Sequence, residues 1–380
     1  MRNDKMRSSK KYLGIFLVLL ALLISIPCSK HSSDPNGFEY TYQVPEQLDD
    51  GWVTASLEDV GIDIDKITAM MNDIYNGEYD FLHSILIVKE DKLVFEEYFN
   101  EFNRTHAHNI KSVSKSIMSA LTGIAFRENF LDSLDRKMLD FYPEYITPNM
   151  DSTKYEITIE HLLMMKAGFD HEENNYLLIY NSDNWIRSTI ELPLLYTPGE
   201  QFRYNSFQCH LVSGIITKVT GMSTRDFANQ YLMEPVGITI HDWAQDPQGI
   251  YFGGNEMLFT ARDMARFGLL YLKNGAWENE QIVPAEWVET STADHTGFSD
   301  LTWGDLHDWN YGYWWWLGKI NDYESYLAIG HGGQFIINIP TLNMVVVATS
   351  ESDVDLDIAN QQELSVLAIV ANHILPAVAN

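Results

Sequence analysis

Three short groups of residues in this sequence could together carry out acyl transfer. Ser112 and Lys115 lie three positions apart, Tyr204 follows near the middle of the chain, and His331 directly precedes two glycines. A serine hydroxyl is a weak nucleophile until a base removes its proton, and an amine or a phenol can do this. Residues three apart on a helix share one face. The set therefore predicts a serine nucleophile activated by Lys115, with Tyr204 relaying protons to the leaving group.

The surroundings of this serine and lysine favour catalysis. Residues 117–125 form an apolar run directly after Lys115, so the expected helix is buried on at least one side. Burial lowers the pKa of a lysine, and the positive charge of Lys111 lowers it further, so that a neutral amine can accept the proton of Ser112. Ser112 would lie in the first turn of the helix, where free N–H groups favour a developing oxyanion.

Each group also has a purely structural interpretation. The serine could be a helix cap, the lysine a solvated side chain, the tyrosine an ordinary half-buried ring, and the last group a hairpin turn with a surface histidine. The same spacing occurs at Ser8 and Lys11, in an N-terminal segment where it has no catalytic meaning. Gly332 and Gly333, in contrast, would let the backbone approach a ligand and pair with it like an added strand.

Other catalytic patterns are absent from the sequence. It contains no G-x-S-x-G elbow, no H-E-x-x-H, no phosphate-binding loop and no dinucleotide glycine fingerprint. His106 and His108 could chelate a metal, but alternate residues on a strand or loop are more often simply exposed. We therefore predict neither a cofactor nor a metal.

The pattern of apolar residues predicts the elements that position these groups. Residues 82–88 and 93–99 are β-rich runs that form a hairpin. Helices are expected over 111–128, 157–166 after Thr158, 211–219, 224–232 after Ser223, and 261–273 after Thr260. Near the C-terminus the pattern predicts strands 323–329, 334–339 and 344–349, and a final helix over 362–374.

Strands at both ends with helices between them predict an α+β fold. The hairpin and the C-terminal strands would join one antiparallel sheet flanked by helices. Residues from roughly 140 to 300 would form a second, mostly helical lobe.

The N-terminus is typical of an export signal. Basic residues precede an apolar run over 12–26, which is short for a membrane-spanning helix. We assign 1–28 to the signal, 29–50 to a flexible tether and 51–380 to the folded domain. Cys28 occupies the position of a lipidated cysteine, although the proline before it departs from the usual small residues. Lipid attachment to a membrane, simple secretion and a retained anchor helix stay open, so the protein would be periplasmic, an outer-membrane lipoprotein or extracellular.

Charge and cysteine content limit the partners. The formal net charge of −28 repels phosphate backbones, which argues against nucleic acid and leaves a small molecule or short peptide as the expected substrate. Cys209 is the only cysteine besides Cys28. If Cys28 is lipidated or removed, no intramolecular disulfide can form. The oligomeric state is not defined by the sequence.

The order S-x-x-K, Y-x-[NS] and [KH]-x-G resembles that of the penicillin-recognising serine hydrolases. The most similar branch is the class C β-lactamase-related proteins, which include esterases, D-aminopeptidases and hydrolases of short nylon oligomers. The resemblance runs over roughly residues 50–375. It includes the segments 157–163 with Gly168, 196–200, 202–204, 253–254, 260–268 and 311–316.

This resemblance implies a β-lactamase/transpeptidase-like fold and a role for each residue. Ser112 would be the acylated nucleophile, and Lys115 and Tyr204 would share the general-base and general-acid work. The backbone N–H groups of Ser112 and Gln334 would form the oxyanion hole. Substrate would be bound by Ser206, His331, Gly332 and Gly333.

Two departures from the family pattern concern the substrate. Ser206 stands where these β-lactamases favour asparagine, and His331 replaces a lysine that would pair with a β-lactam carboxylate. Both favour an ester or an amide or peptide substrate over a β-lactam. Tryptophans 314–316 could form an apolar wall of the pocket, although core packing accounts for at least one of them. The alternative is a non-catalytic envelope protein that binds cell-wall peptide or a protein partner through the same cleft.

Overall fold

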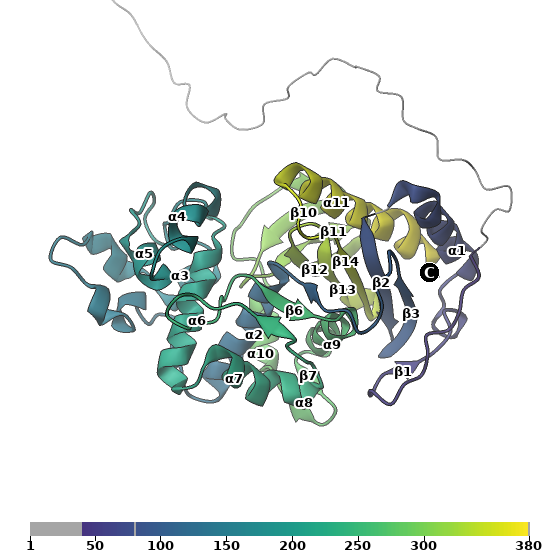
Figure 1. Ribbon diagram of the computed structural model, residues 1–380, viewed down its shortest axis with the longest axis horizontal. Helices are drawn as coiled ribbons and strands as arrows, with labels where there is room; N and C mark the ends of the chain where they lie inside the picture. The colour runs from purple at the N-terminus through teal and green to yellow at the C-terminus, as the bar shows by residue number, and fades with distance from the viewer. Residues whose placement is uncertain (1–39, 80, 379–380) are drawn as a thin grey trace, which may run out of the picture. The chain divides into compact units, whose positions relative to one another are not determined.

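Strands from both ends of the chain form the central sheet of the part that the computed structural model describes, residues 40–79 and 81–378 (Figure 1). Its nine strands lie in the order β1-β3-β2-β14-β13-β12-β11-β10-β9, and every neighbouring pair is antiparallel except β1 and β3. The strands are β1 (Val53–Thr54), β2 (Leu82–Lys89), β3 (Lys92–Tyr98), β9 (Thr302–Trp303), β10 (Leu306–Tyr311), β11 (Trp316–Ile320), β12 (Tyr323–Gly330), β13 (Gln334–Ile339) and β14 (Met344–Ser350). The α+β fold, the hairpin and its pairing with the C-terminal strands are confirmed, whereas β9, β10 and β11 were not predicted.

Both faces of this sheet are covered by helices. Side chains alternate between the faces of a strand, so Leu86 and Val88 pack with α2 (Val113–Arg127) and α9 (Ala261–Leu272), whereas Ile85 and Ile87 pack on the other side. That side is covered by α1 (Ile64–Asp73) and α11 (Leu356–Ile369) (Figure 1). Double coverage explains why the central strands are apolar at nearly every position.

Side-chain caps define where several helices begin. Thr158, Ser223 and Thr260 each accept a hydrogen bond from a backbone N–H of the following turn, as the sequence predicted. Asn205 caps α6 (Ser206–Thr220) in the same way, and Asp355 caps α11, so both helices begin earlier than their apolar runs. The remaining helices are α3 (Ile159–Leu163), α4 (Tyr176–Tyr180), α5 (Trp185–Glu191), α6 (Ser206–Thr220), α7 (Thr224–Ala228), α8 (Glu234–Val236), α10 (Ala285–Ser291) and α12 (Leu375–Ala377).

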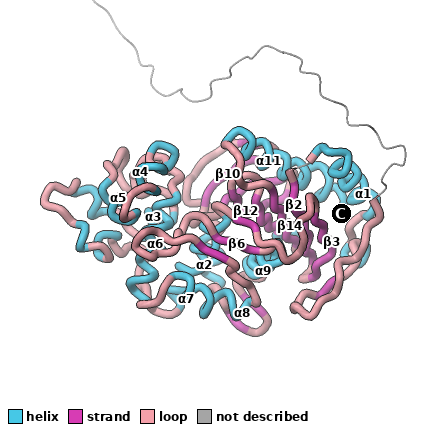
Figure 2. Tube along the Cα trace, viewed as in Figure 1, coloured by secondary structure: helices cyan, strands magenta, loops and turns pink. Residues whose placement is uncertain are grey.

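The middle of the chain is helical but does not form one separate lobe throughout. Helices α3 to α7 cluster together, with loops rather than sheet strands between them (Figure 2). Helix α9 lies on the sheet instead, where a Cβ on Gly268 would come within 2.6 Å of Val345 and 2.7 Å of Ile336. One short sheet joins β4 (His108–Asn109), which precedes α2, to β5 (Asp242–Trp243) and β6 (Met257–Phe259) of this region, and a second consists of β7 (Ala276–Trp277) and β8 (Glu280–Gln281).

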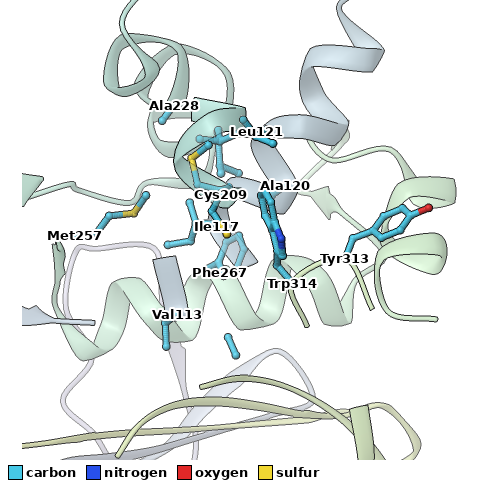
Figure 3. Close-up of a cluster of buried hydrophobic side chains, with 14 of the residues drawn as sticks. Val113, Ile117, Ala120, Leu121, Cys209, Ala228, Met257, Phe267, Tyr313 and Trp314 are labelled. Carbon is cyan, nitrogen blue, oxygen red and sulfur yellow. The ribbon is translucent and has the colours of Figure 1, made fainter. Parts of the chain in front are cut away.

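Helix α2 lies between the helical cluster and the sheet. Its residues Ile117 and Leu121 belong to a single apolar core together with Cys209 of α6, Phe267 of α9 and Trp314 (Figure 3). Burial of α2 on all sides fixes the orientation of its N-terminal turn, which carries Ser112 and Lys115.

Two predictions about the N-terminus lie outside the described residues. Cys28 and the export signal fall in residues 1–39, so lipidation and export stay predictions. Within 40–79 and 81–378, no helix has the length and apolar character needed to cross a membrane. Cys209 is a buried free thiol.

Candidate active site

Ser112 and Lys115 are in direct contact at the start of α2. Lys115 is 1% exposed, and its Nζ donates hydrogen bonds to Ser112 Oγ at 2.7 Å and to the carbonyl oxygen of Gly254 at 2.8 Å. Ser112 is the N-cap residue, yet its side chain caps no backbone N–H. The two structural interpretations, a capping serine and a solvated lysine, therefore do not describe these side chains.

Tyr204 completes the group from a second segment, the loop before α6. Its ring centroid lies 4.7 Å from Lys115 Nζ. The ring stacks on Trp316 at 5.8 Å between centroids, and Tyr311 meets it edge-on at 6.3 Å. These aromatic contacts hold the phenol over the amine, so the structure brings the three predicted catalytic residues together.

The surroundings of Lys115 and Tyr204 leave both groups protonated at neutral pH. Burial lowers the pKa of Lys115 more than any other single effect, but its interactions with Tyr204 and then with Glu172 outweigh burial and raise this pKa above its ordinary value. Burial also raises the pKa of Tyr204, against the lowering effect of the Lys115 charge. The sequence predicted a lowered pKa for Lys115, and the difference arises from its interactions with Tyr204 and Glu172, of which Glu172 was not expected in the site.

Two residues of the site, Gly254 and Glu172, were missed by the sequence analysis. The Gly254 carbonyl holds Lys115, and a Cβ at this position would come within 2.5 Å of the carbonyl oxygen of Ser206. Glu172 Oε2 accepts a hydrogen bond from the Ser206 N–H at 2.7 Å. The Gly253-Gly254 pair was noticed as a family-like segment, which was a usable signal, whereas nothing around Glu172 distinguishes it from other surface acids.

The turn between β12 and β13 lies beside the segment that leads to Ser112. A Cβ on Gly330 would come within 2.3 Å of the Ile110 carbonyl oxygen and 3.0 Å of Gln334 Cβ. The first residue of β13 therefore lies next to the backbone that enters α2. This placement is compatible with the predicted oxyanion role of the backbone N–H groups of Gln334 and Ser112, which stays a prediction.

The predicted substrate-binding residues all have partners inside the protein. His331 Nε2 lies 2.8 Å from the Val354 carbonyl oxygen, and the Gly332 N–H donates to Glu363 Oε1 at 3.1 Å. Gly332 and Gly333 have φ angles of 81° and 92°, which suit glycine alone in this turn. Ser206 is 1% exposed at the start of α6. Their role in substrate binding stays a prediction.

The three tryptophans 314–316 divide between core and site. Trp314 and Trp315 are 1% and 0% exposed, and the Trp314 indole donates to the Leu162 carbonyl at 3.2 Å. Trp316 is half-buried against Tyr204. One of the three thus lines the site.

His106 and His108 gather with His83 around Phe102. The rings of His83 and Phe102 are stacked with centroids 3.6 Å apart, and His108 lies 5.2 Å from His83. Over residues 40–79 and 81–378, no three His, Cys, Asp or Glu side chains are arranged to hold a metal ion.

This histidine cluster should make stability fall in mild acid. Burial, with the nearby charges of His83 and His106, lowers the pKa of His108 to about 4. Below the ordinary histidine pKa, about 6.5, His108 is protonated in the unfolded chain, whereas in the folded chain it stays neutral until about pH 4. Between pH 6.5 and 5 this costs roughly 2 kcal/mol of the free energy of unfolding.

Urea unfolding of wild type and of His108→Asn at several pH values measures this cost. The variant should lose less stability than wild type as the pH falls. Parallel losses in the two proteins would contradict the assignment.

Comparison with known proteins identifies the family. A model of the Beta-lactamase family matches residues 83–369. The chain belongs to the beta-lactamase family. The match extends from the first strand of the hairpin to α11 and includes Ser112, Lys115 and Tyr204.

Relatives of this beta-lactamase family member include hydrolases. It is 24% identical over 296 residues to the 6-aminohexanoate-dimer hydrolase of Paenarthrobacter ureafaciens, covering 70% of this chain and 72% of that protein. Its fold is similar to a putative 6-aminohexanoate-dimer hydrolase from Bacillus anthracis, with a TM-score of 0.65, 21% identity and 87% of both chains covered. It is also similar to EstCE1, a hydrolase with promiscuous acyltransferase activity, with a TM-score of 0.66, 16% identity, and 81% of this chain and 98% of that one covered. The family and its relatives support a hydrolase.

Proposed function

We propose that this protein is a serine hydrolase that forms an acyl-enzyme at Ser112 on an ester or an amide or peptide substrate. The observation that carries the proposal is the 2.7 Å contact between Lys115 Nζ and Ser112 Oγ, with the Tyr204 ring 4.7 Å from the same amine. Serine, a base within hydrogen-bond reach and a second proton carrier are the groups that acyl transfer requires.

The proposed reaction has two stages. Ser112 Oγ attacks the substrate carbonyl while the Lys115–Tyr204 pair takes its proton, and backbone N–H groups at Ser112 and Gln334 stabilise the oxyanion. The C–O or C–N bond then breaks, and the pair returns the proton to the leaving group. Water next attacks the acyl-enzyme with the same groups acting in reverse, which releases the acid and restores the Ser112 hydroxyl.

The names of the relatives favour acyl compounds as substrates. One is a 6-aminohexanoate-dimer hydrolase, and a structurally similar protein is a D-stereospecific amidohydrolase from Streptomyces. Ser206 and His331, which depart from the β-lactamase pattern, point in the same direction. We therefore expect short esters and D-amino-acid amides to be better substrates than nitrocefin.

Burst kinetics with p-nitrophenyl esters test this proposal. A serine hydrolase should release about one equivalent of p-nitrophenol rapidly when deacylation is slow, and a fluorophosphonate should label it covalently. If neither a burst nor a label appears with folded protein, the alternative holds, namely a non-catalytic envelope protein that uses the same cleft for binding.

The rate should rise with pH. Because the pKa values of both Lys115 and Tyr204 are raised, both groups are protonated at neutral pH. The pair must therefore lose one proton before it can accept the proton of Ser112. Loss of that proton creates the base, so log kcat/KM should increase with pH with a slope of about 1 through the neutral range. Initial rates with an ester, corrected for its spontaneous hydrolysis, measure the slope. A pH-independent rate across this range would contradict the assignment.

A further inference from the structure

Glu172 is joined to the loop of Tyr204 by two hydrogen bonds. The backbone N–H of Glu172 donates to the Tyr204 carbonyl oxygen at 3.1 Å, and its side-chain Oε2 accepts from the Ser206 N–H at 2.7 Å. These bonds act on both sides of Asn205, which caps α6. Glu172 thus fixes the path of the chain that carries the phenol.

The same residue connects to the support of Lys115. Ser206 packs directly against Gly254, where a built Cβ would come within 2.7 Å of Ser206 Cβ, and the Gly254 carbonyl accepts a hydrogen bond from Lys115. The Glu172 carboxylate is therefore bonded to Ser206, which follows the Tyr204 loop and packs against the glycine that holds Lys115.

Glu172 also supplies negative charge to a site in which the phenols and the thiol facing Lys115 and Tyr204 are neutral. Lys115 is faced by Tyr204 and Cys209, and Tyr204 is faced by Tyr311 of β10. Burial raises the pKa of Cys209, Tyr204 and Tyr311, so these groups carry a proton at neutral pH. Burial, with the charges of Glu256 and Glu172, also raises the pKa of Tyr176 on α4, which keeps it neutral.

We propose that Glu172 is a positioning residue that holds the Tyr204 loop in place and sets a fixed negative charge beside Lys115. This proposal rests on the proposed function of the same site. The charge favours the ammonium over the amine and the phenol over the phenolate. Glu172 thereby determines the pH at which the base becomes available, without touching the substrate.

The variant Glu172→Gln separates charge from position. Its amide oxygen can still accept the Ser206 N–H, but the negative charge is gone. The pH at which fluorophosphonate labelling of Ser112 reaches half its maximal rate should fall by about half a unit or more. Glu172→Asp keeps the charge but is too short to keep the bond to Ser206, so it should slow labelling while leaving this midpoint near that of wild type.

A neighbouring acid provides the matched control. Glu173 is an exposed carboxylate beside Glu172, and Glu173→Gln should leave both midpoint and rate unchanged. Tyr204 can also be titrated directly by NMR of ¹³Cζ-labelled tyrosine, with its signal assigned from Tyr204→Phe. In Glu172→Gln this titration should move to lower pH by a similar amount.

The two readouts distinguish the possible failures. If wild type is not labelled at all, the proposed function fails, whereas the NMR titration still tests the role of Glu172. If Glu172→Gln leaves the Tyr204 titration and, in a labelled protein, the labelling midpoint at the wild-type pH, Glu172 is a structural residue only and the inference is overturned.

Discussion

Ser112→Ala should abolish covalent labelling and burst kinetics and lower turnover by on the order of 10⁶-fold, as in other enzymes that lose a serine nucleophile. The reason is that Ser112 Oγ is the hydroxyl that Lys115 contacts, at 2.7 Å. Stoichiometric labelling with a fluorophosphonate followed by peptide mass spectrometry measures the effect. Labelling of the variant at the wild-type rate would rule out Ser112 as the nucleophile.

Ser114 offers a control within the same helical turn. Its hydroxyl is buried and donates to the Lys111 carbonyl at 2.7 Å, away from Lys115. Ser114→Ala should therefore keep the label, because it removes a hydroxyl from α2 without removing the nucleophile. Equal loss in both variants would mean that disturbance of the helix, and not loss of Ser112 Oγ, explains the result.

Lys115→Ala should reduce kcat/KM by on the order of 10³-fold or more. Lys115 contacts the Ser112 hydroxyl, the Gly254 carbonyl and the Tyr204 ring. Its removal therefore takes away a proton acceptor and also the contacts that position Ser112 and Tyr204. Steady-state kinetics with a p-nitrophenyl ester measure the loss. A loss smaller than about tenfold would show that Tyr204 or another group is sufficient as the base.

Two further variants separate chemistry from packing. Lys115→Met keeps most of the length of the buried side chain and should be as inactive as Lys115→Ala. Lys111→Ala removes a nearby lysine that lies 4.0 Å from Glu256 and should retain most of the activity. Thermal unfolding of each variant shows whether any loss comes from an unfolded population.

Much of the fold could be predicted because its signals are local. Thr158, Ser223 and Thr260 are followed by helices since each side chain bonds the N–H of the next turn, which depends on neighbouring residues alone. The apolar runs of β2 and β14 likewise indicated strands, and the structure buries both strands at every position. Strand β10 was missed because its residues 307–310 are polar or only partly buried, and its register with β11 shifts between His307 and Asn310.

In the candidate site, too, local spacing could be predicted from the sequence, whereas contacts between distant segments could not. The pairing of Ser112 with Lys115 follows from helical spacing, and the structure places the two atoms in contact. The contact of Lys115 with Gly254 joins residues 139 positions apart, and no local pattern encodes it. Tyr204 was proposed from its type and order along the chain, but its distance from Lys115 depends on how α2 and the loop before α6 pack together.

The sequence by itself thus determined the identities and order of the reacting groups and the α+β arrangement, because helix caps, spacing and apolar runs act between near neighbours. Tertiary structure alone decided the protonation of the site. The sequence predicted a lowered pKa for Lys115 from burial, whereas the folded chain places Tyr204 and Glu172 where their interactions with Lys115 raise this pKa. The outcome differs because electrostatic effects depend on distance and solvent exclusion, which only the packing of distant segments sets.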